Sequence, residues 1–312
     1  MSLKTAFPFP FVNPVFQYTN NLRPLDPPVS IQVTEDYQTE VNLRRKLLSS
    51  HPERCYQSQS GTQGAQWEVL DHLLHELAEV YPDYFSLRVK GSQWSFTNAL
   101  LGETTNFIFA DEASLGFEPL DFVGRQVQED LILMRQVEDE LSLGAGQLCF
   151  PSNWSLNFDL GMPFIDIHRP VPDIVDQGLV TKIQRFLTRI EAGKPWTRLN
   201  WSLNAGYRLD TAAETFDEWG SLRYQVDSDN VGSLIHLRVE EQNLIRMPGS
   251  HALLFTIHTY LMPVQAVCQH PLWCKQFFNV LRTLPREISQ YKGIEPFYDT
   301  LLTYLQNKVT TR

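Results

Sequence analysis

The sequence contains few cysteines and no apolar run long enough to cross a membrane. Its four cysteines are too few and too scattered among 312 residues for a disulfide framework. A membrane-spanning helix needs roughly 18 or more consecutive apolar residues, and the sequence offers no such run. Pro8 and Pro10 interrupt the apolar N-terminal stretch before it resembles a signal peptide. We therefore expect a cytoplasmic protein without membrane contact.

Phosphate-binding signatures and an excess of basic residues are also missing. No Gly-x-Gly-x-x-Gly motif, phosphate-binding loop or Gly-x-Ser-x-Gly motif occurs, so nucleotide binding and serine hydrolysis lose their usual support. The 26 basic and 36 acidic residues give a net charge of −10. This charge repels phosphates, so nucleic acid and anionic membranes are poor candidate partners. An acidic surface instead attracts cations, including protonated amines and basic docking faces.

Length and composition are typical of a chain that buries a core, with 43% hydrophobic and 20% charged residues. Residues 1–35 are rich in proline and aromatic residues, which predicts an extended arm laid over that core. No internal repeat or low-complexity linker interrupts the chain. We expect residues 1–312 to form a single domain with this N-terminal arm and a helical C-terminal extension.

The periodicity of apolar residues predicts helices and strands in separate groups. Spacings of three and four predict helices over 40–49, 65–80, 126–143, 173–190, 272–284 and 295–307. β-Branched and aromatic residues predict strands over 85–89, 93–98, 147–150, 199–207, 233–239 and 252–261. Because helices and strands do not alternate regularly, the predicted class is α+β, with an antiparallel sheet of about five strands and flanking helices.

Potential metal ligands occur in two segments. Cys268, His270 and Cys274 match no common zinc spacing, and free cysteine more often fills a core. His168 is more distinctive, because it precedes two prolines on a stiff backbone within Ile167-His168-Arg169-Pro170-Val171-Pro172. Neutral imidazole is a common ligand of metals and heme iron, although a lone histidine is more often a structural hydrogen-bonding residue.

Basic and aromatic residues gather in two later segments. Trp196-Thr197-Arg198-Leu199-Asn200-Trp201 can wall an apolar pocket and donate to a carboxylate. A buried tryptophan pair with a surface arginine explains this segment equally well. Arg238 and Arg246 can bind a ligand carboxylate or pair with neighbouring glutamates. His258 and Tyr260 lie two apart and share a face if their segment is a strand.

Five short motifs occur in one order along the chain. They are Gln-Glu-Asp-Leu at 128–131, Pro-Ser-x-Trp at 151–154, Ile-His-x-Pro-Val-Pro at 167–172, Arg-x-Asn-Trp at 198–201 and Arg-x-Glu-x-Gln-x-Leu-x-Arg at 238–246. Together they resemble the heme-dependent oxidative N-demethylase alpha subunit and its relatives of unknown function. The resemblance implies a PAS-like antiparallel fold around heme b. It also implies oxidation of a small methylated amine, such as dimethylamine, with oxygen as the oxidant and formaldehyde as a product.

The resemblance further implies that a flavin and iron–sulfur partner supplies the electrons. The chain has neither a cysteine set for its own iron–sulfur cluster nor a nucleotide-binding fingerprint. The reducing equivalents of such an enzyme must therefore arrive from another protein. An alternative function is that of a PAS-like module that binds heme or a small ligand as a sensor without turnover. A scaffold that has lost heme is a third alternative.

By position, the resemblance assigns candidates for the cofactor site. His168 is the candidate axial ligand of the heme iron, with His258 and Tyr260 as competitors. The candidates for pairing with the propionates are three arginines, and a tryptophan is a candidate for the pocket wall. These residues are Arg198, Arg238, Arg246 and Trp201.

The resemblance also offers candidates for catalysis. Glu129 or Asp130 can hold a substrate ammonium, although the solvated face of a helix is the more common role for such a pair. Tyr260 is a third candidate catalytic residue. The sequence departs from the family pattern at Asp159 and Met162, where lysines are usual, and at His258, where arginine is usual. These departures bear on partner docking, heme anchoring and substrate identity.

Overall fold

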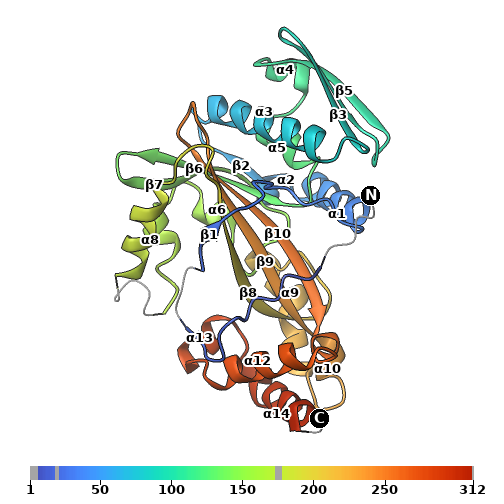
Figure 1. Cartoon of the computed structure of the whole chain (residues 1–312), viewed down its shortest axis with the longest axis vertical. Coiled ribbons are helices and arrows are strands. Elements are labelled where there is room, and N and C mark those ends of the chain that lie inside the picture. The colour runs from blue at the N-terminus through green and yellow to red at the C-terminus, as the bar shows by residue number, and fades with distance from the viewer. Residues whose placement is uncertain (1–5, 18–20, 173–177, 311–312) are drawn as a thin grey trace.

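The computed structural model describes residues 6–17, 21–172 and 178–310, and these form two antiparallel sheets with surrounding helices (Figure 1). The large sheet has seven strands in the spatial order β1-β8-β9-β10-β6-β7-β2. They are β1 (Arg23–Pro24), β2 (Tyr56–Ser58), β6 (Asp130–Val137), β7 (Glu140–Gln147), β8 (Trp196–Ala205), β9 (Ile235–Arg246) and β10 (Leu253–Pro263). The small sheet contains β3 (Phe85–Lys90), β4 (Gln93–Asn98) and β5 (Glu103–Ile108). Antiparallel strands with flanking helices confirm the α+β expectation.

The helices form three groups along the chain. Before β6 stand α1 (Tyr37–Ser50), α2 (Pro52–Cys55), α3 (Gln63–Val80), α4 (Glu112–Leu115) and α5 (Pro119–Gly124). Between β7 and β9 stand α6 (Leu156–Asp159), α7 (Phe164–Ile167), α8 (Leu179–Leu187), η1 (Ala213–Thr215), α9 (Phe216–Trp219), η2 (Gly220–Gln225) and α10 (Val231–Leu234). After β10 stand α11 (Val264–Val267), α12 (Pro271–Arg282), α13 (Arg286–Tyr291), η3 (Glu295–Phe297) and α14 (Tyr298–Thr310). Over the described ranges, no helix combines the length and apolarity needed to cross a membrane.

The strand register separates the large sheet into two faces. Arg198 pairs with Gln242, and Gln242 pairs with Ile257, so these three side chains lie on one face, here called the cavity face. Thr197, Asn243 and Thr256 are paired in the same way on the opposite face, here called the core face. Successive side chains of a strand alternate between the two faces, so a shift of one residue would exchange them.

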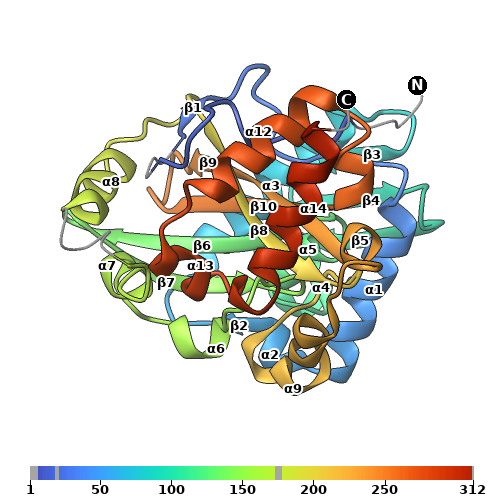
Figure 2. The same ribbon diagram turned by 90° about the horizontal axis from the view of Figure 1, so that it is seen from below.

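Different helices cover the two faces. On the core face, α3 packs against Leu131 and Leu133, while α12 and α14 pack against Leu237 and Val239 (Figure 2). On the cavity face, α7 and α8 pack against residues of β6 and β9, including Leu244. Each fully buried leucine contributes about 2 kcal/mol through the hydrophobic effect, so both layers stabilise the sheet. The helical cover of the cavity face is therefore the segment between β7 and β8.

The N-terminal arm crosses the core face. Ser30 N and Ile31 N each donate to Glu76 Oε1 at 2.7 Å, which fixes the arm against α3. The carbonyl oxygen of Ser30 accepts from Asn243 Nδ2 at 3.0 Å and from Thr256 Oγ1 at 2.9 Å. The described residues of this segment contain no helix, in agreement with the extended arm expected from its prolines. The assignment of the whole chain to a single domain stays a prediction.

The predicted helix over 126–143 is wrong, because this segment forms the hairpin of β6 and β7. Leu131 and Leu133 are buried on the core face, whereas Ile132 and Met134 are buried on the cavity face. A strand buried on both faces loses the alternation of apolar and polar residues, and its continuous apolar run imitates helical spacing. The turn is made near Glu138, which has a positive φ of 53°.

The expectation of about five strands also needs correction. The large sheet gains β1 and β2 at its edges, with two and three residues, and such short strands carry no periodicity to detect. The strands predicted over 85–89 and 93–98 are confirmed as β3 and β4, but they belong to the separate small sheet. Of the helix predicted over 173–190, residues 173–177 lie outside the described residues, and α8 begins at Leu179.

Candidate functional site

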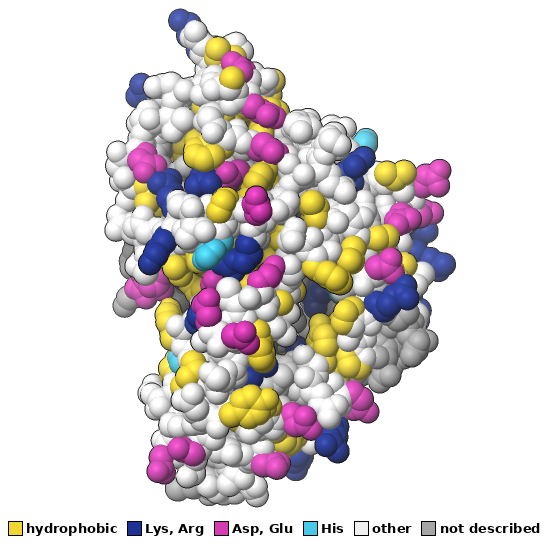
Figure 3. Space-filling model, turned by 180° about the vertical axis from the view of Figure 1, so that it is seen from behind, with side chains coloured by type: hydrophobic (Ala, Val, Ile, Leu, Met, Phe, Trp, Pro, Cys, Tyr) yellow, Lys and Arg dark blue, Asp and Glu magenta, His cyan; other side chains and the backbone are white. Residues whose placement is uncertain are grey.

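A cavity of about 440 Å³ lies between the cavity face of the sheet and the helices α7, α8 and α13. Much of its wall is apolar and comes from β6, α8, β9 and β10. Examples are Ile132, Val180, Ile183, Leu187, Leu244 and Ile257. Figure 3 shows a hollow on this side of the molecule, with lysine or arginine side chains inside it. A volume of this size suits a small organic ligand or cofactor, for which concave apolar sites are typical.

Three basic side chains line the cavity. Arg198 projects from β8, Arg223 from η2 and Lys292 from the residue after α13. Arg198 Nε is buried without a hydrogen-bond partner among the described residues, and burial lowers the pKa of this guanidinium against an opposing effect of Glu240. Arg223 lies over the Trp219 ring, with 4.6 Å between the guanidinium carbon and the ring centroid. A buried cation without an anionic partner is costly, so this part of the wall is suited to an anionic ligand group.

Lys292 reaches the cavity across the edge of β8. β1 pairs with β8 only through Trp196 and Thr197, which leaves the following backbone groups of β8 without a strand on that side. Lys292 Nζ donates to the carbonyl oxygen of Trp201 at 2.7 Å and lies 4.6 Å from the Trp201 ring centroid. Burial lowers the pKa of Lys292 to about 8, against an opposing effect of Glu240. The lysine is therefore mainly protonated at pH 7 but titrates close to the physiological range.

His168 lines the same cavity from the C-terminal end of α7. Its Nδ1 lies 2.8 Å from the carbonyl oxygen of Phe164, a geometry in which Nδ1 donates. The other ring nitrogen, Nε2, then carries the lone pair. Burial lowers the pKa of His168, which favours the neutral ring. In metal sites, a hydrogen bond of this kind, made by the ring nitrogen that does not bind the metal, orients the histidine ligand.

Two carboxylates line the cavity, and they differ in their partners. Glu240 accepts from Arg238 Nε at 3.2 Å, from Asn200 Nδ2 at 3.2 Å and from Gln242 Nε2 at 3.1 Å. Asp159, at the end of α6, has no ion pair or side-chain hydrogen bond with any of the described residues. Burial raises the pKa of Asp159 to about 6. Asp159 is thus the carboxylate in this cavity that is open to a cationic ligand.

Arg238 and Arg246 lie outside the cavity lining and donate to backbone carbonyls. Arg238 donates to the carbonyl oxygens of Leu209 at 2.8 Å and Phe150, besides its pairing with Glu240. Arg246 donates to the carbonyl oxygens of Ile190 at 3.1 Å and Leu187 at 2.6 Å. Both guanidiniums hold chain segments together, and neither is directed at the cavity.

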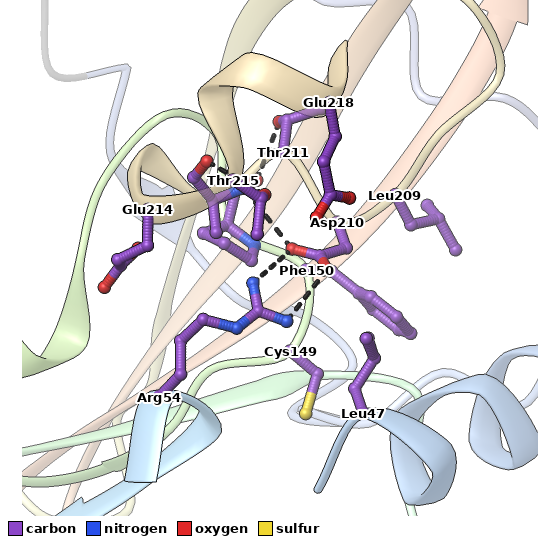
Figure 4. A network of polar contacts seen from close by, with 12 residues as sticks. Leu47, Arg54, Cys149, Phe150, Leu209, Asp210, Thr211, Glu214, Thr215 and Glu218 are labelled. Carbon is purple, nitrogen blue, oxygen red and sulfur yellow. Dashed lines mark hydrogen bonds and ion pairs between the residues drawn. The ribbon is translucent and has the colours of Figure 1, made fainter. Parts of the chain in front are cut away.

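A polar network joins the segment that leads into the helical cover to the segment after β8 (Figure 4). Arg54 of α2 donates twice to Asp210, with distances of 2.8 and 2.9 Å. Thr211 Oγ1 donates to the carbonyl oxygen of Pro151 at 2.9 Å, which ties the segment after β8 to the segment after β7. The bidentate, charge-assisted pair of Arg54 and Asp210 fixes the relative orientation of the two side chains. The network therefore positions the chain where the cover begins, close to Phe150.

Glu129, His258 and Tyr260 form a separate cluster on the core face. His258 Nδ1 lies 2.8 Å from Glu129 Oε1, which also accepts from Gln32 N at 2.7 Å. Although burial opposes protonation, the charge of Glu129 raises the pKa of His258. The rings of His258 and Tyr260 are 4.5 Å apart. The sheet itself separates this cluster from the cavity.

Asp130 lies in a buried ion pair. Its carboxylate is 2.9 Å from Arg44 Nη2 of α1 and accepts from Cys149 N at 2.7 Å and Phe150 N at 3.0 Å. It is fully buried, because it begins strand β6 and does not lie on the helix that was expected there. A solvated helix face for Glu129 and Asp130 is therefore wrong, since both side chains are buried.

The structure brings two of the predicted site residues together, namely His168 and Arg198, whereas Trp201 contributes to the cavity lining at the edge of β8 while its ring packs against Phe11 on the core face. It adds Lys292, Arg223 and Asp159 to them. Asp159 was singled out in the sequence only as a departure from the family pattern. Arg238, Glu240 and Gln242 occur at every second position of β9, a spacing that places polar side chains on one face of a strand. This spacing was the sequence signal that could have identified Glu240 as a residue of the cavity face. Lys292 and Arg223 carry no sequence signal, because their segments reach the cavity only through tertiary packing.

The family of the chain follows from its match to a family model. Residues 21–302 match the model described as Haem-dependent oxidative N-demethylase, alpha subunit-like. The match includes every cavity residue discussed above. The family name implies haem dependence and a partner subunit. The match over residues 21–302 also confirms the resemblance indicated by the five ordered motifs. The chain belongs to the haem-dependent oxidative N-demethylase alpha subunit-like family.

Proposed function

We propose that the cavity binds heme b and that the protein carries out oxidative N-demethylation of a small methylated amine, with oxygen and externally supplied electrons. The observation that carries the proposal is a largely apolar cavity with a neutral histidine in its wall and, beside it, an arginine whose Nε has no hydrogen-bond partner among the described residues. Family membership supports the same cofactor and reaction. The central strands also support a PAS-like core, because β7-β6-β10-β9-β8 are adjacent and helices α6 to α8 cover one face.

The cavity residues fit the two chemical parts of heme. The porphyrin is apolar, in keeping with the aliphatic wall, while its two propionates are anions. His168 would hold the heme iron through Nε2, and Arg198 and Lys292 would pair with the propionates. These take the place of Arg238 and Arg246, whose donors are occupied. Among the described residues, no group of three or more His, Cys, Asp or Glu side chains is arranged for a metal, so iron would depend on ligands that a porphyrin supplies.

The chain's own residues have distinct roles in this proposal. Heme, when bound, supplies oxygen activation. The aliphatic wall excludes water from the reacting centre, and the Phe164 carbonyl holds His168 in one orientation. Asp159 holds the ammonium of the substrate, in place of Glu129 and Asp130, because it lines the cavity and has no ion pair with any residue that the structure describes. A cationic substrate close to Asp159 would also favour the ionised carboxylate.

The test begins with absorption spectra of the protein purified from heme-supplemented cells. We expect a strong Soret band that is lost or shifted in His168→Ala and unchanged in His251→Ala, an exposed histidine outside the cavity. With electrons supplied by NADPH through a reductase and a ferredoxin, in place of dithionite, which itself consumes oxygen, dimethylamine should then increase oxygen uptake and release formaldehyde. No Soret band after hemin titration would contradict the proposal. A Soret band without amine-dependent oxygen uptake would instead establish the sensor alternative.

A further inference from the structure

A second hollow lies on the outer surface, between α8 and the extended segment that contains β1. Its volume is about 710 Å³, and its lining runs from Pro24 to Pro28 on one side and from Lys182 to Trp196 on the other. We call it the α8 groove. Four basic residues line the α8 groove, namely Lys182, Arg185, Arg189 and Lys194, against two acidic ones, Asp26 and Glu191.

The cations of the α8 groove are largely uncompensated. Lys182, Arg185 and Arg189 are exposed, and within the described ranges none of them forms an ion pair. Glu191 is paired with Lys194 at 2.6 Å, which leaves Asp26 as the remaining acidic side chain of the lining. The whole chain carries a net charge of −10. The α8 groove is therefore a basic site on an acidic protein, and an acidic partner is repelled by most other surfaces.

Helical geometry places these cations opposite the cavity. At about 100° per residue, Val180, Ile183 and Leu187 fall on one side of α8, and they line the cavity. Lys182 and Arg185 fall on the opposite side of the same helix. A partner in the α8 groove would thus be separated from the cavity by about one helix diameter, roughly 10 Å.

Two aromatic side chains connect the α8 groove with the cavity wall. Phe186 and Trp196 line the groove, and their rings are 4.8 Å apart at an angle of 89°. Both pack against the apolar cluster that contains Val180 and Leu187 of the cavity wall. The groove and the cavity therefore share one layer of side chains.

We propose that the α8 groove docks the acidic face of the electron-donor protein. This inference rests on the proposed heme function, because only a redox cofactor in the cavity gives a donor a reason to dock there. In each docking event one electron passes from a reduced iron–sulfur cluster, which is oxidised, to ferric heme, which is reduced. No bond is formed or broken. Complementary charge accelerates such an encounter by 10-fold to about 1,000-fold and makes it sensitive to salt.

The probe is a reduced plant-type [2Fe–2S] ferredoxin with strong negative charge, mixed with the heme-loaded full chain under anaerobic conditions. The groove variant is Lys182→Glu, Arg185→Glu and Arg189→Glu. The matched control is Lys46→Glu, Arg88→Glu and Lys90→Glu, which reverses three exposed charges on α1 and β3. We expect the groove variant to slow heme reduction by about tenfold or more at low salt. The control should change it less than threefold, and dithionite should reduce all proteins equally fast.

Carbodiimide cross-linking provides a readout that is independent of heme. Amide bonds between ferredoxin carboxylates and the chain should map to Lys182 or Lys194 by mass spectrometry, with loaded or unloaded protein. Equal slowing in both variants, no slowing in either, or cross-links confined to other lysines would overturn the docking site. A missing Soret band would refute the heme proposal, and the cross-link map would still decide whether an acidic protein binds the groove.

Discussion

The two faces of the large sheet both bury ionisable residues, but they treat the charges differently. On the core face, His258 forms an ion pair with Glu129 Oε1 at 2.8 Å, and this oxygen accepts a further hydrogen bond from the arm, while Glu129 Oε2 has no hydrogen-bond partner among the described residues. In the cavity, Arg198 Nε has no partner and Asp159 has no ion pair with a described residue. Buried charges that satisfy each other hold segments together, whereas buried charges left open around a cavity indicate a ligand site. The extent of burial alone does not distinguish a structural ion pair from a ligand site.

The largest effect is expected from Glu129→Ala, which breaks the paired side of this comparison. The substitution leaves His258 buried without its carboxylate and should lower the free energy of unfolding by about 3 kcal/mol. Urea unfolding measures this loss. Because Glu129 raises the pKa of His258, the difference between variant and parent should be largest below pH 6.5 and shrink as pH rises through the folded-state pKa. Heme affinity should be unchanged in Glu129→Ala at a low temperature, where the variant stays folded. A large loss of heme affinity there would mean that the two faces are not independent.

Arg198→Leu tests the unpaired side and should have the opposite effect on the heme-free protein. Removing a cation without a partner should raise the unfolding midpoint of that form by about 2 °C. The same variant should bind hemin at least tenfold more weakly, because a charge-assisted pair with a propionate is lost. Thermal scans and hemin titration check both parts. A lower midpoint in the heme-free variant would show that Arg198 already stabilises the fold.

Asp159→Asn should change the response of the enzyme to pH. For the parent, the KM for dimethylamine should rise as pH falls through about 6, since the carboxylate is protonated and no longer attracts the ammonium. The variant should have about a tenfold higher KM at pH 7.5 and should lack this rise. Steady-state oxygen uptake measures both. An unchanged KM would exclude Asp159 from substrate binding.

The smallest effect is expected from Lys292→Arg. Burial lowers the pKa of Lys292 to about 8, so in the parent hemin affinity should fall by a fewfold as pH rises above 8 and the ammonium loses its charge. Arginine stays charged at these pH values, so the variant should bind hemin almost independently of pH between 7 and 9. Hemin titrations across this range measure the difference. The same decline in both proteins would assign the titration to another group.

Much of the sheet could be predicted from residue types, and the exceptions have a physical explanation. Segments 199–207, 233–239 and 252–261 overlap β8, β9 and β10, because their β-branched and aromatic residues have high strand propensity. The hairpin of β6 and β7 was mistaken for a helix, since burial on both faces removed the period of two. Edge strand β1 has only two residues, which is too short for any periodicity.

The sequence by itself determined the family, through five ordered motifs that a family model also matches, and the α+β class. It also directed attention to His168 and Arg198, which meet in the cavity, and to Trp201, which borders the cavity at the edge of β8. Only the tertiary structure decided which buried charges are paired. Arg238 and Arg198 belong to equally basic motifs, yet one is satisfied by Glu240 and backbone carbonyls while the other is not. The physical reason is that a partner for a side chain is set by register and packing between distant segments, which local sequence does not encode.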